Sequence, residues 1–155
     1  MKTLKDLVNE CLQHVEEVFP WDLQEEFDQG KRLTILDIRE PYEFEVAHIK
    51  NSINVPRGIL ESASEYEYEE TVPELAAARD QDIVLVCRSG NRSVLAADVM
   101  QKMGFQTVRS LKTGLRGWND AEQPLYDKNE QPVDVDEAED YFTPKLKPDQ
   151  LRPKT

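Results

Sequence analysis

The chain has 155 residues, which is enough for one domain with a hydrophobic core and little more. Its formal net charge of −12 disfavours nucleic acid and anionic membranes as partners, because an acidic surface repels phosphate groups. No run of about 18 or more apolar residues occurs, and the charged N-terminus lacks an apolar signal core, so we expect a cytoplasmic protein.

The cysteines and histidines are too few and too scattered for a metal centre. Cys11 and Cys87 form no CxxC pair, and His14 and His48 do not complete a zinc site. The sequence therefore predicts no metal, no cofactor and no disulfide framework. It predicts a reduced compartment and one special thiol instead.

The first segment predicts an amphipathic helix. Apolar residues recur at helical spacing over 4–15, with charged and polar residues between them, and Pro20 discourages helix in the residue before it. We expect a helix of about four turns that belongs to an N-terminal extension, residues 1–19. Cys11 lies on the apolar stripe and is interpreted as a small buried hydrophobe.

Short apolar segments alternate with helical patterns through the middle of the chain. Each apolar segment is continuous and bounded by turn residues, which is typical of strands buried on both faces of a parallel sheet. In chain order we expect a helix at 21–29, a strand at 33–38, a short helix at 40–45, a strand at 52–55, an exposed connection at 61–70, a helix at 71–80, a strand at 83–87, a helix at 92–103, a strand at 107–111 and a helical turn at 114–121. This alternation predicts an α/β fold with a central, mostly parallel sheet of about five strands flanked by helices.

The composition changes after Tyr126, where an acidic stretch is followed by alternating lysine and proline. Such a segment buries little apolar surface, so we expect an acidic, flexible tail over 127–155. Docking of a segment around Tyr141 and Phe142 is the alternative. The main domain then spans 20–126.

The segment 82–93 carries the strongest chemical signal in the chain. Its apolar run ends in Cys87, a polar loop with Gly90 follows, and a helical pattern begins near Arg92. In a parallel sheet this order places the thiol at the carboxyl end of a buried strand, with loop amides and a helix start pointing toward it. That setting favours a thiolate and a bound anion. The sequence therefore predicts a catalytic thiolate that handles an anion.

The length of the loop distinguishes between two chemistries. The spacing from Cys87 to Arg92 is C-x4-R, a cradle of six residues. Tyrosine-phosphatase-like enzymes use C-x5-R, a larger cradle that holds a tetrahedral phosphate. The shorter cradle fits a smaller group, such as one extra sulfur on the cysteine, and leaves a phosphatase or arsenate reductase as the less favoured alternative.

Four ordered motifs resemble the rhodanese family, and specifically its single-domain sulfurtransferases of the thiosulfate sulfurtransferase type. They lie at 36–45, 47–56, 87–93 and 114–118. Three departures occur: Val46-Ala47 stands where a glycine commonly precedes the histidine, Lys50-Asn51-Ser52 replaces the family's Pro-Gly-Ala, and Gly114-Leu-Arg-Gly117 replaces adjacent glycines. The resemblance covers 22–124 and implies a rhodanese-like three-layer fold.

The resemblance also implies a two-step reaction at Cys87. The thiolate attacks the outer sulfur of a small anionic donor such as thiosulfate and becomes a persulfide, and a thiophilic acceptor, cyanide or a cellular thiol, removes that sulfur. Loop amides stabilise the anionic sulfur, and Gly90 allows the backbone angles that turn them inward. We assign donor binding to the loop residues Arg88, Ser89, Gly90, Asn91, Arg92 and Ser93.

Several loop side chains have two interpretations. Arg88 is expected to contact the substrate, whereas Arg92 either contacts it or ties the loop to a carboxylate. Ser93 either donates its hydroxyl to the sulfur or serves the helix that follows. Asp37 and Arg39 are expected to form an ion pair that supports the loop geometry.

The other candidates have structural interpretations. His48 is expected to bond to backbone and Trp118 to belong to the core, while Arg57 either adds charge at the pocket rim or is solvated. A second functional hypothesis comes from the N-terminal helix and the acidic tail. In it the protein is a persulfide-carrying relay or regulatory binding module, with a protein as its sulfur acceptor.

Overall fold

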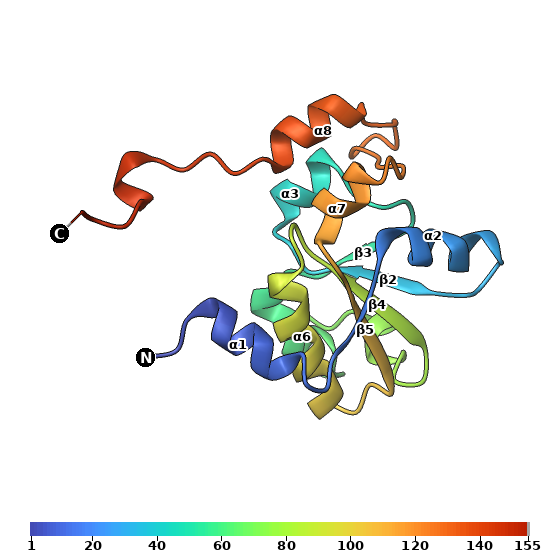
Figure 1. Ribbon diagram of the computed structural model, residues 1–155. Helices are drawn as coiled ribbons and strands as arrows, with labels where there is room; N and C mark the ends of the chain where they lie inside the picture. Colours follow the sequence, from blue (N-terminus) through green and yellow to red (C-terminus); the bar gives the residue numbers. More distant parts are fainter. Residues whose placement is uncertain (155) are drawn as a thin grey trace.

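The computed structural model describes residues 1–154. Within this range a five-stranded sheet forms the centre of the molecule (Figure 1). Its strands are β1 Glu16–Val18, β2 Thr34–Asp37, β3 Ile53–Asn54, β4 Asp82–Val86 and β5 Thr107–Leu111. They are ordered β1-β5-β4-β2-β3, and all four pairings are parallel. The α/β class and the parallel sheet predicted from the alternating pattern are confirmed.

Helices cover both faces of this sheet. Those on the described residues are α1 Leu4–Cys11, α2 Pro20–Asp28, α3 Pro41–Val46, α4 Leu60–Ala63, α5 Pro73–Ala76, α6 Asn91–Lys102, α7 Gly114–Asp120 and α8 Val135–Phe142, with short 3-10 helices at Arg57–Ile59 and Pro148–Gln150. The core divides into two clusters: α1, α4, α5 and α6 contribute to one, and α2, α7 and α8 to the other. The molecule is therefore a three-layer sandwich. No helix within 1–154 is long and apolar enough to cross a membrane.

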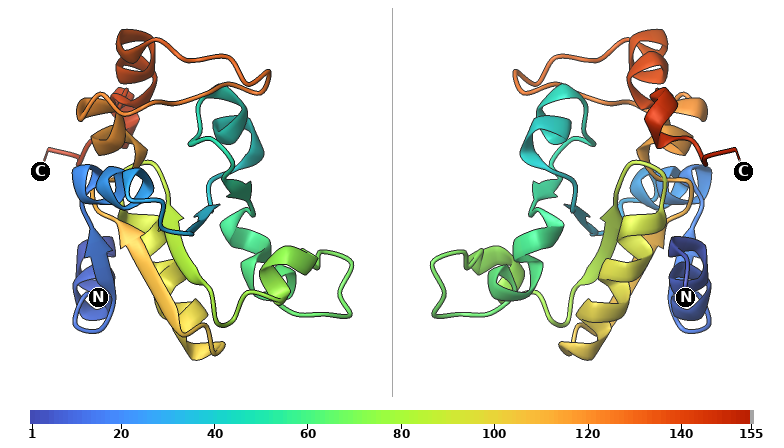
Figure 2. Two further views of the ribbon diagram at one scale, coloured as in Figure 1. Left: turned by 90° about the vertical axis from the view of Figure 1, so that its right-hand side faces the viewer. Right: turned by 90° about the vertical axis from the view of Figure 1, so that its left-hand side faces the viewer.

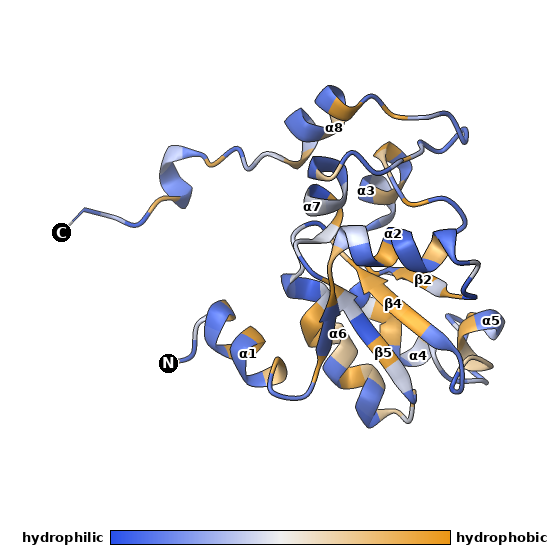
Figure 3. Ribbon diagram, turned by 45° about the vertical axis from the view of Figure 1, so that its right-hand side comes forward, coloured by the Kyte–Doolittle hydropathy of each residue, from blue (hydrophilic) through white to orange (hydrophobic). Residues whose placement is uncertain are grey.

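The central strand β4 explains how the two layers are separated. Successive strand residues point to opposite faces, so Ile83 and Leu85 join the cluster with α6, whereas Val84 and Val86 join the cluster with α7. All four side chains are fully buried, and the strand lies as a hydrophobic band between the helices (Figure 3). Cys87 follows at the carboxyl end of β4 and belongs to the α6 side.

The N-terminal segment differs from the predicted four-turn helix. A capping box between Thr3 and Asp6 starts α1, but the helix ends at Cys11 after eight residues. The chain then extends, and β1 pairs with the edge of β5. Val15 lies outside the helix, but it is buried against the core. Its burial is the reason why an apolar residue occurs at that position, and its agreement with the helical spacing is a coincidence. The predicted four-turn helix was therefore wrong. β1 is the fifth strand of the sheet, for which the sequence predicted no position.

The segment after Tyr126 is not a flexible tail throughout, and the alternative of a docked segment around Tyr141 and Phe142 agrees with the structure. It forms α8, in which Ala138 and Phe142 are each only 1% exposed. The Asn119 side chain of α7 donates a hydrogen bond to the Val135 carbonyl over 2.9 Å. Beyond α8 the chain runs away from the body of the molecule (Figure 1).

The predicted helix at 71–80 is shorter in the structure and the exposed connection at 61–70 begins in α4. α5 ends at Ala76, and the Arg79 guanidinium of the following turn donates to the carbonyls of Ser64, Ala76 and Met103. Of these carbonyls, that of Ala76 is one that a longer helix would have paired internally, and the other two tie the turn to neighbouring segments. The chain between α4 and α5 projects from the body in both views of Figure 2.

Candidate active site

The loop after β4 is shaped by Gly90. Its φ of 95° lies in the left-handed region, which favours glycine, and it directly precedes α6. An added Cβ would lie 3.2 Å from the backbone nitrogen of Thr113 and 3.4 Å from the carbonyl oxygen of Leu111. Both the backbone angle and the space therefore select glycine here, and the turn redirects the chain so that nitrogens of the loop face Cys87.

Three hydrogen-bonding groups surround the Cys87 sulfur. The backbone N–H groups of Gly90 and Ser93 donate to Sγ over 3.1 Å and 3.3 Å, and the Ser93 hydroxyl lies 3.2 Å from it. That hydroxyl also lies 2.7 Å from the buried Ser110 hydroxyl of β5. Cys87 itself is 1% exposed. The arrangement is a cradle of donors that can stabilise a negative charge on sulfur.

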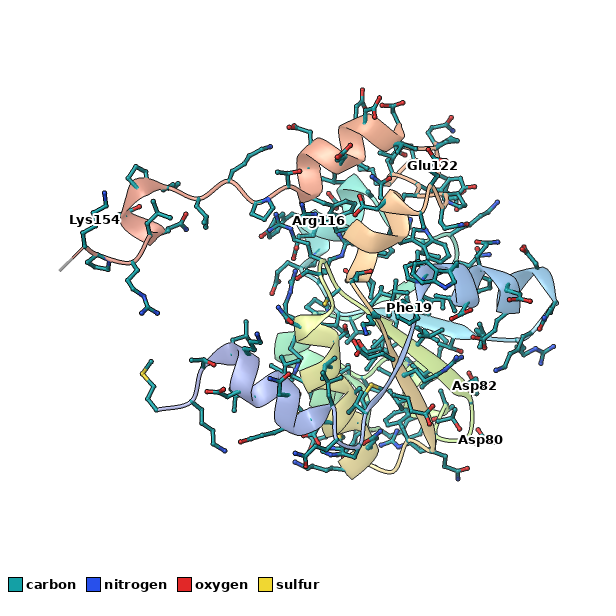
Figure 4. All side chains as sticks on the ribbon, in the orientation of Figure 1. Phe19, Asp80, Asp82, Arg116, Glu122 and Lys154 are labelled. Carbon is teal, nitrogen blue, oxygen red and sulfur yellow. The ribbon has the colours of Figure 1, made fainter. Side chains whose placement is uncertain are left out.

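The start of α7 supports the loop from behind. The N–H groups of Leu115 and Arg116 donate to the carbonyls of Cys87 and Arg88 over 2.9 Å and 3.0 Å. Gly114 makes this approach possible, because a Cβ there would lie 2.5 Å from the Arg88 carbonyl. Figure 4 shows Arg116 far from Asp80 and Asp82, which lie at the other end of the sheet. The glycine motif at 114–117 was recognised in the sequence, but its contact with the loop after β4 was not predicted.

Arg92 forms an ion pair that ties the loop to α3. Its guanidinium donates to both carboxylate oxygens of Glu43, over 3.0 Å and 2.9 Å. Burial raises the pKa of Glu43, but hydrogen bonds from Arg92 and from the Glu40 N–H outweigh it, so the pKa lies below its usual value. Of the two interpretations of Arg92, the structure has the tie to a carboxylate. Glu43 itself was not among the predicted site residues.

Arg88 contacts the end of α8. Its Nε and Nη2 donate to the Phe142 carbonyl over 3.2 Å and 2.8 Å. A partly open cavity of about 110 Å³ lies beside this contact and is lined by Arg39, Tyr42, Glu43, Arg88, Tyr141 and Phe142. Burial raises the pKa of the Tyr141 phenol in this wall. The expected substrate contact of Arg88 stays a prediction. The contact with α8 agrees with the alternative of a docked segment around Tyr141 and Phe142, although the sequence did not indicate Arg88 as its partner.

The predicted ion pair between Asp37 and Arg39 is present and buried. Arg39 Nη2 lies 2.8 Å from Asp37 Oδ2 and also donates to the Ala47 carbonyl over 2.6 Å. The Asn54 side chain donates to the carbonyls of both members of the pair. These bonds fix the turn between β2 and α3, and Glu43 extends from α3 to Arg92. The pair makes no hydrogen bond to residues 87–93 among the described residues, but Arg39 lines the same cavity as Arg88.

The remaining predicted loop residues, Ser89 and Asn91, are exposed. They line a groove of about 650 Å³ between the loop and α1. Arg57 forms an ion pair with Glu61 over 2.9 Å rather than reaching the loop. Within the described range no group of three or more histidine, cysteine or acidic side chains is placed to hold a metal ion.

The structural interpretations of His48, Trp118 and Cys11 agree with the structure. His48 Nδ1 lies 2.7 Å from the Phe44 carbonyl, so this histidine is bonded to backbone. Trp118 is 1% exposed, and its indole N–H donates to the Pro124 carbonyl over 2.9 Å. Cys11 is partly buried against the core cluster of α6, as its place on the apolar stripe predicts.

The family model of the rhodanese-like domain matches residues 20–121. The chain belongs to this family. The rhodanese-like chain is 36% identical over 95 residues to the "Putative sulfur carrier protein YrkF" of Bacillus subtilis. The matched region covers 61% of this chain and 46% of that protein. It is 30% identical over 115 residues to the "Putative thiosulfate sulfurtransferase, mitochondrial" of Schizosaccharomyces pombe, and this match covers 68% of this chain and 81% of that protein. The chain thus spans about half the length of the Bacillus relative.

Solved structures show the same fold. A protein of unknown function from Rhodopseudomonas palustris, described as a possible tyrosine phosphatase, is 29% identical with a TM-score of 0.74, covering 81% of this chain and 95% of that one. A rhodanese-related protein from Thermoplasma volcanium is 27% identical with a TM-score of 0.58, covering 71% and 96%. The rhodanese-like resemblance is therefore confirmed, in a family of sulfurtransferases and sulfur carriers.

Proposed function

We propose that this rhodanese-like protein is a thiosulfate sulfurtransferase in which Cys87 carries the transferred sulfur. The observation that supports the proposal most strongly is the cradle around Sγ, with its two backbone N–H donors and one hydroxyl within 3.3 Å. A thiolate and a persulfide anion both place negative charge where these donors point, so both states of the cycle gain from them.

In the first step the Cys87 thiolate attacks the outer sulfur of thiosulfate. A bond forms between Sγ and that sulfur, the sulfur–sulfur bond of thiosulfate breaks, and sulfite leaves with the bonding electron pair. The product is a persulfide whose terminal sulfur is anionic. In the second step an acceptor, cyanide in the assay or a thiolate in the cell, attacks the terminal sulfur and releases the Cys87 thiolate.

The two arginines differ in what they offer an anionic donor. The charge of Arg92 is compensated by Glu43, at 2.9 Å. Arg88 donates to the neutral carbonyl of Phe142 and forms no ion pair among residues 1–154, so its positive charge is not cancelled by that contact. We assign the attraction of the donor chiefly to Arg88 and the maintenance of the loop chiefly to Arg92.

The proposal is tested by incubating the protein with thiosulfate and cyanide and measuring thiocyanate. Cys87→Ser should abolish its formation, because a hydroxyl cannot form the persulfide. Cys11→Ser is the matched control: it removes the other cysteine, which lies in α1, and should keep the activity. Activity that survives Cys87→Ser would reject the assignment. Intact mass after thiosulfate treatment should show one added sulfur atom, which cyanide removes.

A sulfur-carrier role is the second candidate, and it is favoured by the name of the Bacillus relative. A carrier keeps its persulfide until a protein acceptor arrives. Cys87 loaded with labelled sulfur and freed of donor should then retain the label in excess small thiol for much longer than an enzymatic turnover. Rapid loss to the small thiol would favour the enzyme. Deleting the chain after Tyr126 does not separate the two, because α8 contacts Arg88.

A phosphatase role is the third candidate, and it is raised by the description of the Rhodopseudomonas structure. The C-x4-R spacing of this chain argues against it, since the cradle is shorter than that of tyrosine phosphatases. The test is hydrolysis of p-nitrophenyl phosphate by the same preparation that is assayed for thiocyanate. Hydrolysis that depends on Cys87 in the absence of sulfur transfer would replace the proposal.

A further inference from the structure

A second hollow lies apart from Cys87, on the face of the sheet covered by α2 and α7. Its volume is about 390 Å³, which is in the range of small-molecule sites. Its floor is apolar and includes Phe27, Leu33, Ile49, Trp118 and Tyr126. None of the residues 87–93 lines it. The hollow is therefore separate from the candidate active site.

The charge around this hollow is opposite to that of the chain as a whole. Acidic residues outnumber basic ones by 31 to 19 in the sequence, yet the lining includes Lys31, Arg32 and Lys50 and no carboxylate. Lys31 is already paired with Glu26, at 2.8 Å. Arg32 and Lys50 have no ion pair among residues 1–154. Two uncompensated positive charges thus border an apolar floor.

The position of Lys50 is set by a tight turn. Asn51 has a φ of 64°, in the left-handed region, and the Ser52 N–H donates to the Ile49 carbonyl over 3.1 Å. Lys50 Nζ lies 5.6 Å from the centroid of the Tyr126 ring. The same turn is where the sequence replaces the Pro-Gly-Ala of the family pattern. The cation at this rim is therefore a property of this chain and not of the family motif.

We propose that this hollow binds a small organic anion with a flat apolar body, of the aromatic carboxylate or aromatic sulfonate class. The apolar body packs on the floor formed by Phe27, Ile49 and Trp118, and the acid group is held by Arg32 and Lys50. An apolar floor alone would accept neutral aromatic molecules equally well. The two unpaired cations select the anion, since they gain charge-assisted hydrogen bonds that a neutral molecule does not offer.

The probe for this site is 8-anilinonaphthalene-1-sulfonate, an aromatic anion whose fluorescence rises in apolar surroundings. We expect saturable binding to the full chain. The double variant Arg32→Glu, Lys50→Glu should weaken it at least about tenfold, because two charge-assisted contacts become repulsive. Both side chains are exposed, so folding is expected to be unchanged. The control variant Lys128→Glu, Lys145→Glu changes the net charge equally with two other exposed lysines, and should bind as the wild type does.

Two further measurements locate the probe. The neutral N-phenyl-1-naphthylamine, which has a similar aromatic body, should bind the charge-reversed variant and the wild type equally. In a Trp21→Phe background Trp118 is the remaining tryptophan, so its emission should be quenched on saturation with the anionic probe. No saturable binding, an equal loss in the control variant, or unchanged Trp118 emission would overturn the proposal. Thiocyanate formation should be the same in all these variants, so this site and the function of Cys87 are tested separately.

Discussion

At the scale of single residues, Ser93 links the sulfur to the sheet. Its hydroxyl lies within reach of Cys87 Sγ, the Gly90 carbonyl and the Ser110 hydroxyl, so it is placed where it can donate to an anionic sulfur at Cys87. Ser93→Ala should reduce thiocyanate formation about tenfold, which corresponds to an activation barrier higher by about 1.4 kcal/mol, while the backbone donors remain. Ser62→Ala, on α4, is the matched control. Equal activity of the Ser93→Ala variant and the wild type would show that the hydroxyl does not act on the sulfur.

Gly114 allows a second residue-scale prediction. Gly114→Ala adds a Cβ that meets the Arg88 backbone at 2.5 Å, in addition to the cost of a φ of 63°. We expect a loss of about 3 kcal/mol in the free energy of unfolding, measured with urea. Gly104→Ala separates the two causes, because Gly104 has a φ of 90° but open space around it. That variant should lose only about 1–2 kcal/mol, the cost of the left-handed backbone. Similar losses in both variants would mean that the close approach at Gly114 is relieved at little cost.

Sequence reasoning at this scale reached the loop but not its partners. Cys87, Gly90 and Ser93 lie within seven consecutive positions, so their proximity follows from one local turn. Glu43 is 49 positions from Arg92, and Phe142 is 54 positions from Arg88. Such contacts depend on how whole elements pack, and no local pattern encodes them. The donors of the candidate site and the Asp37–Arg39 pair were therefore predictable from local sequence, whereas the identity of the distant partners of Arg88 and Arg92 was not.

At the scale of elements, α8 connects the C-terminal segment to the site. It packs through Phe142, and the carbonyl of that residue orients the Arg88 guanidinium. Phe142→Ala should therefore raise the KM for thiosulfate more than it lowers kcat, because the cation that attracts the donor loses its orientation.

A double-mutant cycle with Arg88→Ala tests this route. If α8 acts through Arg88, the double variant should have nearly the KM of Arg88→Ala alone. Additive effects on KM would mean that α8 acts on the site by some other contact. Leu151→Ala is the control, because Leu151 is an exposed apolar residue in the same C-terminal segment.

The elements found and missed differ in their apolar content. β4 contains a continuous apolar run over 83–86, which is typical of a strand buried on both faces of a sheet. β2 and β5 are shorter in apolar content, but each has at least two apolar residues bounded by polar ones. β1 has three residues, of which only Val18 is buried, so its strand signal is too short to read. In α8 the apolar residues Val135, Ala138 and Phe142 stand among acidic ones, and the composition resembles that of a solvated tail. Tertiary contacts with the rest of the fold, and not local preference, determine both elements.

At the scale of the whole molecule, the free energy of unfolding depends on pH in the acid range, because carboxylates that are ion-paired in the folded protein take up protons there. Hydrogen bonds from Arg109 lower the pKa of Glu26 to about 2, from a usual value of 4.5. This pair joins α2 to β5 at 2.8 Å. Because the pKa is lowered on folding, the pair stabilises the protein above pH 4.5, and this contribution is lost as the pH falls toward 2.

The matching prediction compares Glu26→Gln with the wild type in urea. At pH 7 the variant should be less stable by about 2 kcal/mol, because each pKa unit is worth about 1.4 kcal/mol and water partly screens the pair. This difference should shrink between pH 4.5 and pH 3, as Glu26 takes up a proton on unfolding. Glu25→Gln, an exposed neighbour on α2, should show no such trend. A difference that is constant with pH would exclude the ion pair as its cause.

The main-chain origin of the cradle has a consequence for how this site can diversify. The N–H groups that face Cys87 belong to Gly90 and Ser93, and those that hold the loop belong to Leu115 and Arg116, so side-chain replacement does not remove them. Ser89 and Asn91, by contrast, are exposed and face the groove toward α1. Substitutions there can alter which molecules approach while the surroundings of the sulfur persist. The backbone groups that act on the sulfur and the side chains that face an approaching molecule thus belong to different parts of the polypeptide, so selectivity can change by substitution while these backbone groups are kept.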